Sequence, residues 1–321
     1  GALRLAPEAL RARKATVDRI AEAGPYDTAT LADWAAAHLN SEVADQLISA
    51  AIRSIYAAEP SGVSRVELLG MLALFKGARL VAFREGMGSY AAALADRLDV
   101  TLNAQVLEVR QLADGAEVTW RDAGGAEHCE QVAGCVVALN AQDAAAVRPD
   151  LDAWRADYLR AVNRGPIVTP NIALDRPPAG VGATYAMIAR REHPFLGGIL
   201  CDHHKAPGRV PDGTGLVTLT LTTDWCARHW DEDDDAIVEH ALGAAERYVP
   251  GTADQVRFAE VTRWTQQYAP VGHYARLGEF RARSAREDRS VVLCGEYLSA
   301  PHLSAATASG EAAAAALQKV D

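Results

Sequence analysis

The residues best placed to do chemistry lie near the end of the chain, where a strand is expected to run into a helix. An apolar run at 291–294 is followed by Gly295 and Glu296. Glycine lets a backbone approach a ligand closely, and α/β sheets bind ligands at the carboxyl ends of their strands. A helix is predicted over 304–319 with Ser304 as its cap. Its free amides and positive dipole end would stabilise negative charge that develops on a bound group.

This strand–loop–helix pattern has two interpretations from its spacing alone. A reduced flavin ring carries negative charge that a helix amino end would stabilise, whereas an ordinary strand–helix unit has the same spacing. Residues 294–297 (Cys-Gly-Glu-Tyr) and 301–310 (Pro-His-Leu-Ser-Ala-Ala-Thr-Ala-Ser-Gly) resemble the C-terminal flavin motif of the flavin amine oxidase, protoporphyrinogen oxidase and phytoene desaturase superfamily. Ser304 and Ala305 replace the glutamate and glycine that are usual in this motif.

Four earlier segments resemble the same superfamily in the same order. They are 83–94, a glycine turn opening a helix; 105–109, a strand; 135–140, a second strand; and 263–272. The resemblance implies FAD as the cofactor, with the backbone of Val106 on its adenine side. It gives the cofactor-binding residues as Gly86, Met87, Val106, Gly295, Glu296, Ser304, Ala305 and Ala306.

The resemblance also implies the reaction, in which a substrate C–H hydride passes to flavin N5. It assigns Tyr274 and His302 as two walls over the flavin, with His302 able to move a proton near neutral pH. The alternative is that both are ordinary loop side chains. Amine-oxidising members carry a lysine at about the position of Thr169, and its absence favours an apolar or cyclic substrate over an amine. His273 stands where some members attach flavin through cysteine, so no thioether link is expected.

The superfamily's first element, a strand, a G-x-G-x-x-G turn and a helix that hold the pyrophosphate, has no match in these 321 residues. The segments 86–88 and 180–182 lack the third glycine. The segment is therefore expected on a second polypeptide, with removal or original absence as alternatives. The chain alone is expected to bind FAD weakly or not at all. A non-catalytic substrate-binding or scaffold subunit is the competing functional interpretation.

The elements that position these residues predict an α/β fold, an amine-oxidase-like two-domain fold without its N-terminal βαβ dinucleotide unit. Residues 1–80 are predicted as the helical part of the substrate domain. Residues 81–164 and 288–321 form the remaining FAD-binding part, which includes a hairpin turning at Asp114-Gly115. Residues 165–287 form a substrate-binding sheet with a helix. The strand at 135–139 is entirely apolar and is predicted to be buried on both faces.

Composition excludes several classes of partner. The net charge of −10 disfavours nucleic acid and other polyanions. No apolar run reaches the roughly 18 residues of a membrane span. Five cysteines, mostly far apart, indicate a reduced, cytoplasmic protein. The resemblance implies a small-molecule substrate.

No metal site is predicted from the sequence. The adjacent residues Cys201, Asp202, His203 and His204 cannot all face one ion. Cys226 and His229 would add ligands only if the fold brought them there. The acidic run 231–235 is interpreted as the first turn of a helix, where carboxylates favour the macrodipole.

Overall fold

The computed structural model describes residues 5–75, 81, 83, 85–179 and 182–318. The first part is helical, as predicted, and its helices close around a core that includes Leu31, Ile52 and Leu68. Thr30 caps the second helix by accepting from the Asp33 amide at 3.0 Å. The helices are α1 (Ala6–Arg11), α2 (Leu31–His38), α3 (Ser41–Val43), α4 (Ala50–Ile55) and α5 (Val66–Phe75).

The next part combines two small sheets with helices. The predicted hairpin is confirmed as an antiparallel pair, β1 with β2, and β3 extends it in the order β1-β2-β3. A parallel pair joins β4 to β10 from the end of the chain, with Val136 opposite Val292. The elements are α6 (Gly88–Ala95), β1 (Gln105–Leu112), β2 (Gly115–Arg121), β3 (Glu127–Val132), β4 (Cys135–Val137), α7 (Ala141–Val147), α8 (Ala153–Arg160) and β10 (Val291–Leu293).

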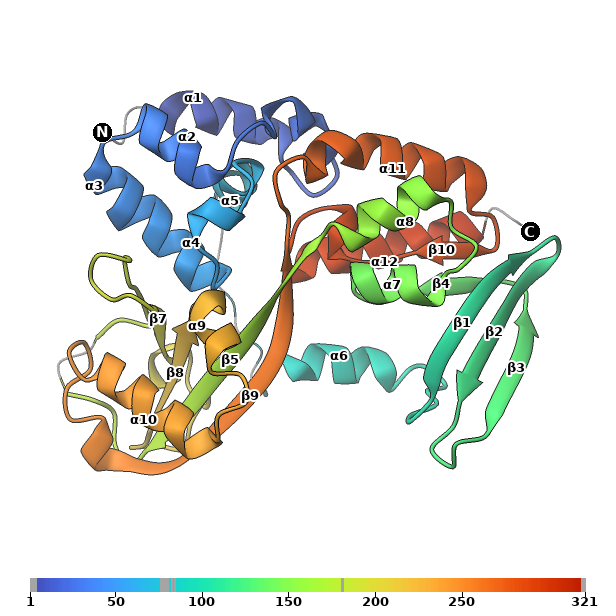
Figure 1. Ribbon diagram of the computed structural model, residues 1–321. Helices are drawn as coiled ribbons and strands as arrows, with labels where there is room; N and C mark the ends of the chain where they lie inside the picture. The colour runs from blue at the N-terminus through green and yellow to red at the C-terminus, as the bar shows by residue number, and fades with distance from the viewer. Residues whose placement is uncertain (1–4, 76–80, 82, 84, 180–181, 319–321) are drawn as a thin grey trace.

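A five-stranded antiparallel sheet follows, in the order β6-β7-β8-β5-β9. Side chains alternate along β5, so that Val168 and Ile172 are fully buried on one face. Helices α9 and α10 cover that face (Figure 1). The elements are β5 (Asn163–Leu174), β6 (Tyr185–Met187), β7 (Leu196–Cys201), β8 (Gly215–Leu221), α9 (Thr223–Arg228), α10 (Asp234–Ala245) and β9 (Val256–Tyr268).

Two long helices complete the described chain, α11 (His273–Glu287) and α12 (Leu303–Leu317). Leu277 and Phe280 of α11 are fully buried in a core shared with α7, α8, β4 and β10. The long strands β5 and β9 run from this part into the five-stranded sheet (Figure 1). None of the helices in the described residues combines the length and the apolar run needed to cross a bilayer.

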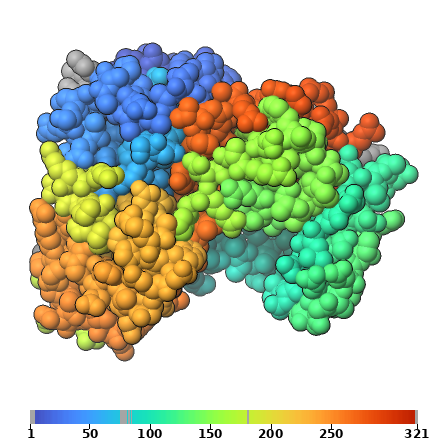
Figure 2. All heavy atoms as spheres, viewed as in Figure 1, coloured from blue at the N-terminus to red at the C-terminus, as the bar shows by residue number. Residues whose placement is uncertain are grey.

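The strand predicted to be buried on both faces is not. Val137 is buried, but Val136 on the opposite face of β4 is 38% exposed, because no described element covers that face. Helix α6 is similar, since none of its residues is buried and Leu94 is 51% exposed. Figure 2 shows α6 set back between the five-stranded sheet and the three-stranded sheet.

Candidate active site

The start of α12 is organised by His302, and the prediction of Ser304 as its cap is wrong. His302 has extended backbone dihedrals, and its Nδ1 accepts a hydrogen bond from the Ala305 amide at 3.1 Å. Its carbonyl accepts from Ala305 at 3.0 Å and from Ala306 at 3.2 Å. Ser304 lies inside the first turn of α12, so it is not the residue that precedes the helix.

The turn between β10 and α12 is tied to the helix that follows it. The Gly295 amide donates to Ser309 Oγ at 3.0 Å. A Cβ at position 295 would overlap the ring of Tyr297, so the requirement for glycine comes from the protein's own packing. Glu296 begins a 3₁₀ turn, Glu296–Leu298. Gly295 and Glu296 are thereby held at the carboxyl end of β10, where the sequence placed them.

Burial shifts the pKa of two predicted site residues, Glu296 and His302. It raises the pKa of the Glu296 carboxyl above its usual range, and it is the sole cause of that shift. Burial also lowers the pKa of His302, which favours the neutral imidazole at neutral pH. A neutral imidazole that caps a helix through Nδ1 carries its proton on Nε2.

Tyr274 is buried in the interior on the first turn of α11. Its side chain is 1% exposed, and its hydroxyl donates to Glu67 Oε1 at 2.7 Å. Its amide donates to Asp27 Oδ2 at 2.7 Å. Burial raises the pKa of Glu67 to about 7. Sequence reasoning missed Glu67, whose only signal is that it is the one carboxylate inside the apolar run 66–75.

A cavity of about 10 Å³ brings some of the predicted residues together. Tyr274 and Glu296 both line it, with Gln267 and His273. Such a volume holds no more than a water molecule. His302 is not among its lining residues.

Gly86 and Met87 lie directly before α6, a helix that contacts α12. Gly86 has a φ of 91°, a left-handed conformation that favours glycine, and Met87 is 55% exposed. Tyr90 of α6 lies within hydrogen-bond distance of Thr307 of α12, with 3.2 Å between the hydroxyl oxygens. Val106 is on the separate three-stranded sheet, at an irregularity of β1, and is 39% exposed.

A hollow of about 780 Å³ lies between α11, α12 and β10. Among the described residues, β10 pairs with β4 alone, and both Val292 and Leu293 line the hollow. The side that α12 contributes is a row of small residues: Ala305, Ala308, Ser309, Ala312, Ala313 and Ala316. The hollow is therefore bounded on one side by β10 and on another by a face of α12 that carries only small side chains.

The five-stranded sheet carries polar and aromatic groups on the face that α9 and α10 leave uncovered. Trp264 of β9 is 46% exposed, and its Nε1 donates to Thr169 Oγ1 at 3.3 Å. Thr218 Oγ1 donates to Asn171 Oδ1 at 2.9 Å on the neighbouring strands. Thr169 thus lies on the open face of the sheet.

Comparison with known proteins assigns the family. The family model described as flavin containing amine oxidoreductase matches residues 1–318. The chain belongs to this family. Flavin is the family's cofactor, which confirms the prediction of FAD. No curated protein matches this chain significantly.

Solved structures confirm the predicted amine-oxidase-like fold of this chain. Cyclohexylamine oxidase from Brevibacterium oxydans IH-35A superposes with a TM-score of 0.74 at 15% identity, over 98% of this chain and 73% of that one. Putrescine oxidase gives 0.72 at 14% identity, over 98% and 73%. A candidate protoporphyrinogen oxidase from Exiguobacterium sp. 255-15 gives 0.69 at 14%, over 91% and 66%.

The described residues of this chain fit one side of a flavin site. Glu296 offers a half-buried carboxyl without a counter-charge, beside the amino end of α12. His302 bonds the Ala305 and Ala306 amides of that helix end, so a flavin would meet the imidazole before it meets those amides. The dinucleotide side of the site would need groups other than these.

Proposed function

We propose that this chain is part of an FAD-dependent oxidoreductase that takes a hydride from a C–H bond of an organic, largely hydrophobic or cyclic substrate. The observation that carries the proposal is the β10–Gly295–Glu296–α12 unit, in a chain matched along 1–318 by the flavin containing amine oxidoreductase family. Bound flavin would supply the electron-accepting chemistry at N5. The chain itself would bind and orient the substrate and would exclude water from the site.

Individual residues of the chain have separate tasks in this proposal. Gly295, Glu296 and Ser304 hold the flavin side of the site, with Ala305 and Ala306 behind the His302 cap at the first turn of α12. His302, neutral and fixed by its capping bond, takes or gives a proton through Nε2. Tyr274 positions the wall of the site from behind through Glu67, since its hydroxyl is already bonded there.

The open face of the five-stranded sheet is the proposed substrate surface. Trp264 presents nearly half of its side chain, which suits the flat face of a ring. Asn171 and Thr218 add hydrogen-bonding groups that fix orientation. Amine oxidation is the second candidate, supported by the family description and opposed by Thr169 in place of a lysine.

We also propose that a βαβ segment on a second polypeptide completes FAD binding. A parallel strand beside β10 would fill the hollow and continue the β4–β10 pair, while Gly86, Met87 and Val106 would face the cofactor from the other side. Apolar side chains at the surface support this proposal, because an exposed apolar patch marks an interaction site. They include Met87, Leu94, Leu98, Val106, Val136 and Leu139. With five free cysteines, we place the complex in the reducing cytoplasm.

The experiment that tests this function uses the chain reconstituted with its partner segment. Cyclohexanone and cyclohexylamine are a matched pair of cyclic probes that differ in the functional group. Anaerobic mixing should bleach the oxidised flavin absorbance with the ketone and not with the amine. Faster bleaching by the amine would favour the second candidate, and bound flavin that no cyclic probe reduces would favour a non-catalytic subunit.

A further inference from the structure

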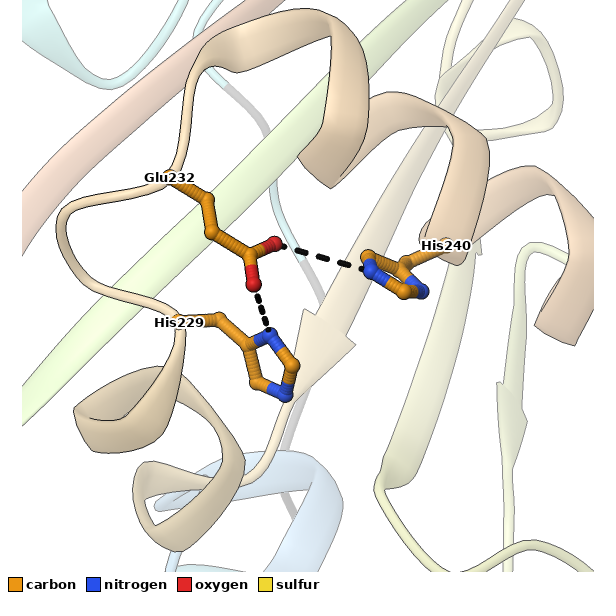
Figure 3. A group of neighbouring side chains, drawn as sticks. All are labelled: His229, Glu232 and His240. Atoms are coloured by element: carbon orange, nitrogen blue, oxygen red, sulfur yellow. Dashed lines mark hydrogen bonds and ion pairs between the residues drawn. The ribbon is translucent and has the colours of Figure 1, made fainter.

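Three side chains with metal-binding atoms converge on the outside of the five-stranded sheet, away from its open face. His229 follows α9, Glu232 lies in the next loop and His240 lies within α10 (Figure 3). His229 Nδ1 is 2.7 Å from Glu232 Oε1, and His240 Nε2 is 3.5 Å from Glu232 Oε2. The ligand atoms of all three lie within 4.8 Å of one another.

Two residues of the cluster, His229 and Glu232, also have contacts outside it. The His229 ring stacks on the buried Trp225, with centroids 4.1 Å apart and planes 18° apart. Arg263 donates from Nε to the Trp230 carbonyl at 3.0 Å and from Nη2 to the Glu232 carbonyl. The His229 imidazole and the Glu232 backbone are therefore positioned by groups other than the atoms that would bind an ion, as outer contacts do in a preorganised site.

One oxygen of the cluster has no hydrogen-bond partner. Glu232 Oε2 is shielded from solvent and accepts no hydrogen bond in the described structure, although the residue as a whole is partly exposed. An acceptor shielded in this way costs free energy unless a cation or a donor satisfies it. His240 Nε2 lies 3.5 Å from this oxygen and is itself a metal-binding atom when the imidazole is neutral.

Two of the nearby acidic residues, Asp233 and Asp234, are engaged elsewhere. Asp233 caps α10 by accepting from the Ala236 amide at 2.8 Å. Asp234 pairs with Arg263. This agrees with the interpretation of the acidic run as a first helical turn, and it leaves Glu232 as the carboxylate that faces two imidazoles.

We propose that His229 Nδ1, Glu232 and His240 Nε2 bind one Zn²⁺ ion, with a water in the fourth position. Two imidazoles and one carboxylate suit a borderline divalent cation. In a tetrahedral zinc site the ligand atoms lie about 3.3 Å apart. The separations of 2.7 and 3.5 Å involve different oxygens of Glu232, and all three ligand atoms lie within 4.8 Å of one another, so the side chains must draw closer together to bind one ion. The ion cross-links the α9–α10 loop to α10, independently of the flavin chemistry.

Calorimetric titration of the untagged chain with Zn²⁺ tests the site. We expect about one equivalent to bind, and Glu232→Gln and His240→Ala each to weaken binding at least about tenfold. His128→Ala is the matched control, because His128 also pairs with a carboxylate, Asp122, at 2.8 Å but lacks a third ligand. Binding by this control should equal that of the wild type.

Two further measurements keep the test decisive. His240 is 47% exposed and Glu232 is 37% exposed, so metal-free thermal unfolding should be nearly the same for both variants and the wild type. Cu²⁺ bound at the site should quench the fluorescence of Trp225, because the Trp225 ring contacts both imidazoles. Absence of Zn²⁺ binding, or equal binding by wild type, Glu232→Gln and His240→Ala, would overturn the proposal and leave the cluster as a His–Glu–His ion-pair chain.

Discussion

The Tyr274 hydroxyl donates a hydrogen bond of 2.7 Å to the Glu67 carboxylate, and both side chains are buried. The bond joins α5 of the helical part to α11, next to the candidate active site. Asp27 reinforces the junction by accepting from the Tyr274 amide at 2.7 Å. The helical part and the flavin-facing part are therefore held together by polar groups, whose protonation affects stability.

Glu67 should make the protein less stable as the pH rises. Burial raises its folded pKa to about 7 from 4.5, so the unfolded chain releases this proton first. The free energy of unfolding of the wild type, relative to Glu67→Gln, should fall by up to about 3 kcal/mol between pH 4.5 and 7. Urea unfolding of both proteins across this range measures it. Parallel curves would contradict the prediction.

Tyr274→Phe tests the same pair from the donor side. The Tyr274 hydrogen bond lowers the Glu67 pKa and partly offsets the effect of burial. Without the hydroxyl, the Glu67 pKa should rise further, and the loss of stability should extend to higher pH. The pH at which the urea midpoint stops falling reports this. A shift toward lower pH would mean that the hydroxyl does not stabilise the carboxylate.

His273 should act in the opposite direction over nearly the same pH range. Burial lowers its folded pKa to about 4 from 6.5, and its Nε2 lies 3.1 Å from the Tyr297 carbonyl oxygen. Stability contributed by the neutral imidazole is therefore present above pH 6.5 and is lost as the pH falls toward 4. Relative to His273→Gln, the wild type should lose up to about 3 kcal/mol. A difference that does not vary with pH would show that His273 titrates normally.

His302 has a structural and a proposed chemical role that two variants separate. His302→Ala removes the cap of α12 and should cost about 1 kcal/mol. His302→Asn keeps a capping oxygen and removes the imidazole, so it should restore the stability and leave turnover of the reconstituted enzyme low. Thermal unfolding and turnover are measured together. Wild-type turnover in both variants would remove the proposed proton-transfer role.

The hollow beside β10 should be sensitive to a bulky residue on α12. Ala312 lines the hollow, whereas Ala315, which is also exposed on the same helix, does not. Ala312→Trp should weaken association with the βαβ segment at least about tenfold, and Ala315→Trp should not. Light scattering or calorimetry with the purified segment measures both. Equal affinities would show that the segment binds elsewhere.

Local sequence signals predicted the elements well where a short pattern is sufficient. The hairpin at Asp114-Gly115 and the strand–turn–helix at 291–317 both depend on neighbouring residues. Caps were less predictable, because several polar residues compete near each helix start. At α12, His302 is the cap that Ser304 was expected to be.

Long-range contacts had no such signal. Glu67 and Tyr274 are far apart in sequence, and nothing in either local pattern indicates that α5 and α11 meet. The cluster of His229, Glu232 and His240 was missed because its geometry depends on how the loop after α9 packs against α10. The exposure of Val136 depends on what covers the sheet, which a strand's own residues do not specify.

Flavin retention by the purified chain tests the central claim most directly. The chain is incubated with excess FAD, separated from free flavin by gel filtration, and examined by absorbance spectroscopy, alone and after co-expression with the βαβ segment. We predict little or no flavin with the chain alone and about one flavin per complex when the segment is present. A full flavin spectrum on residues 1–321 alone would contradict the account.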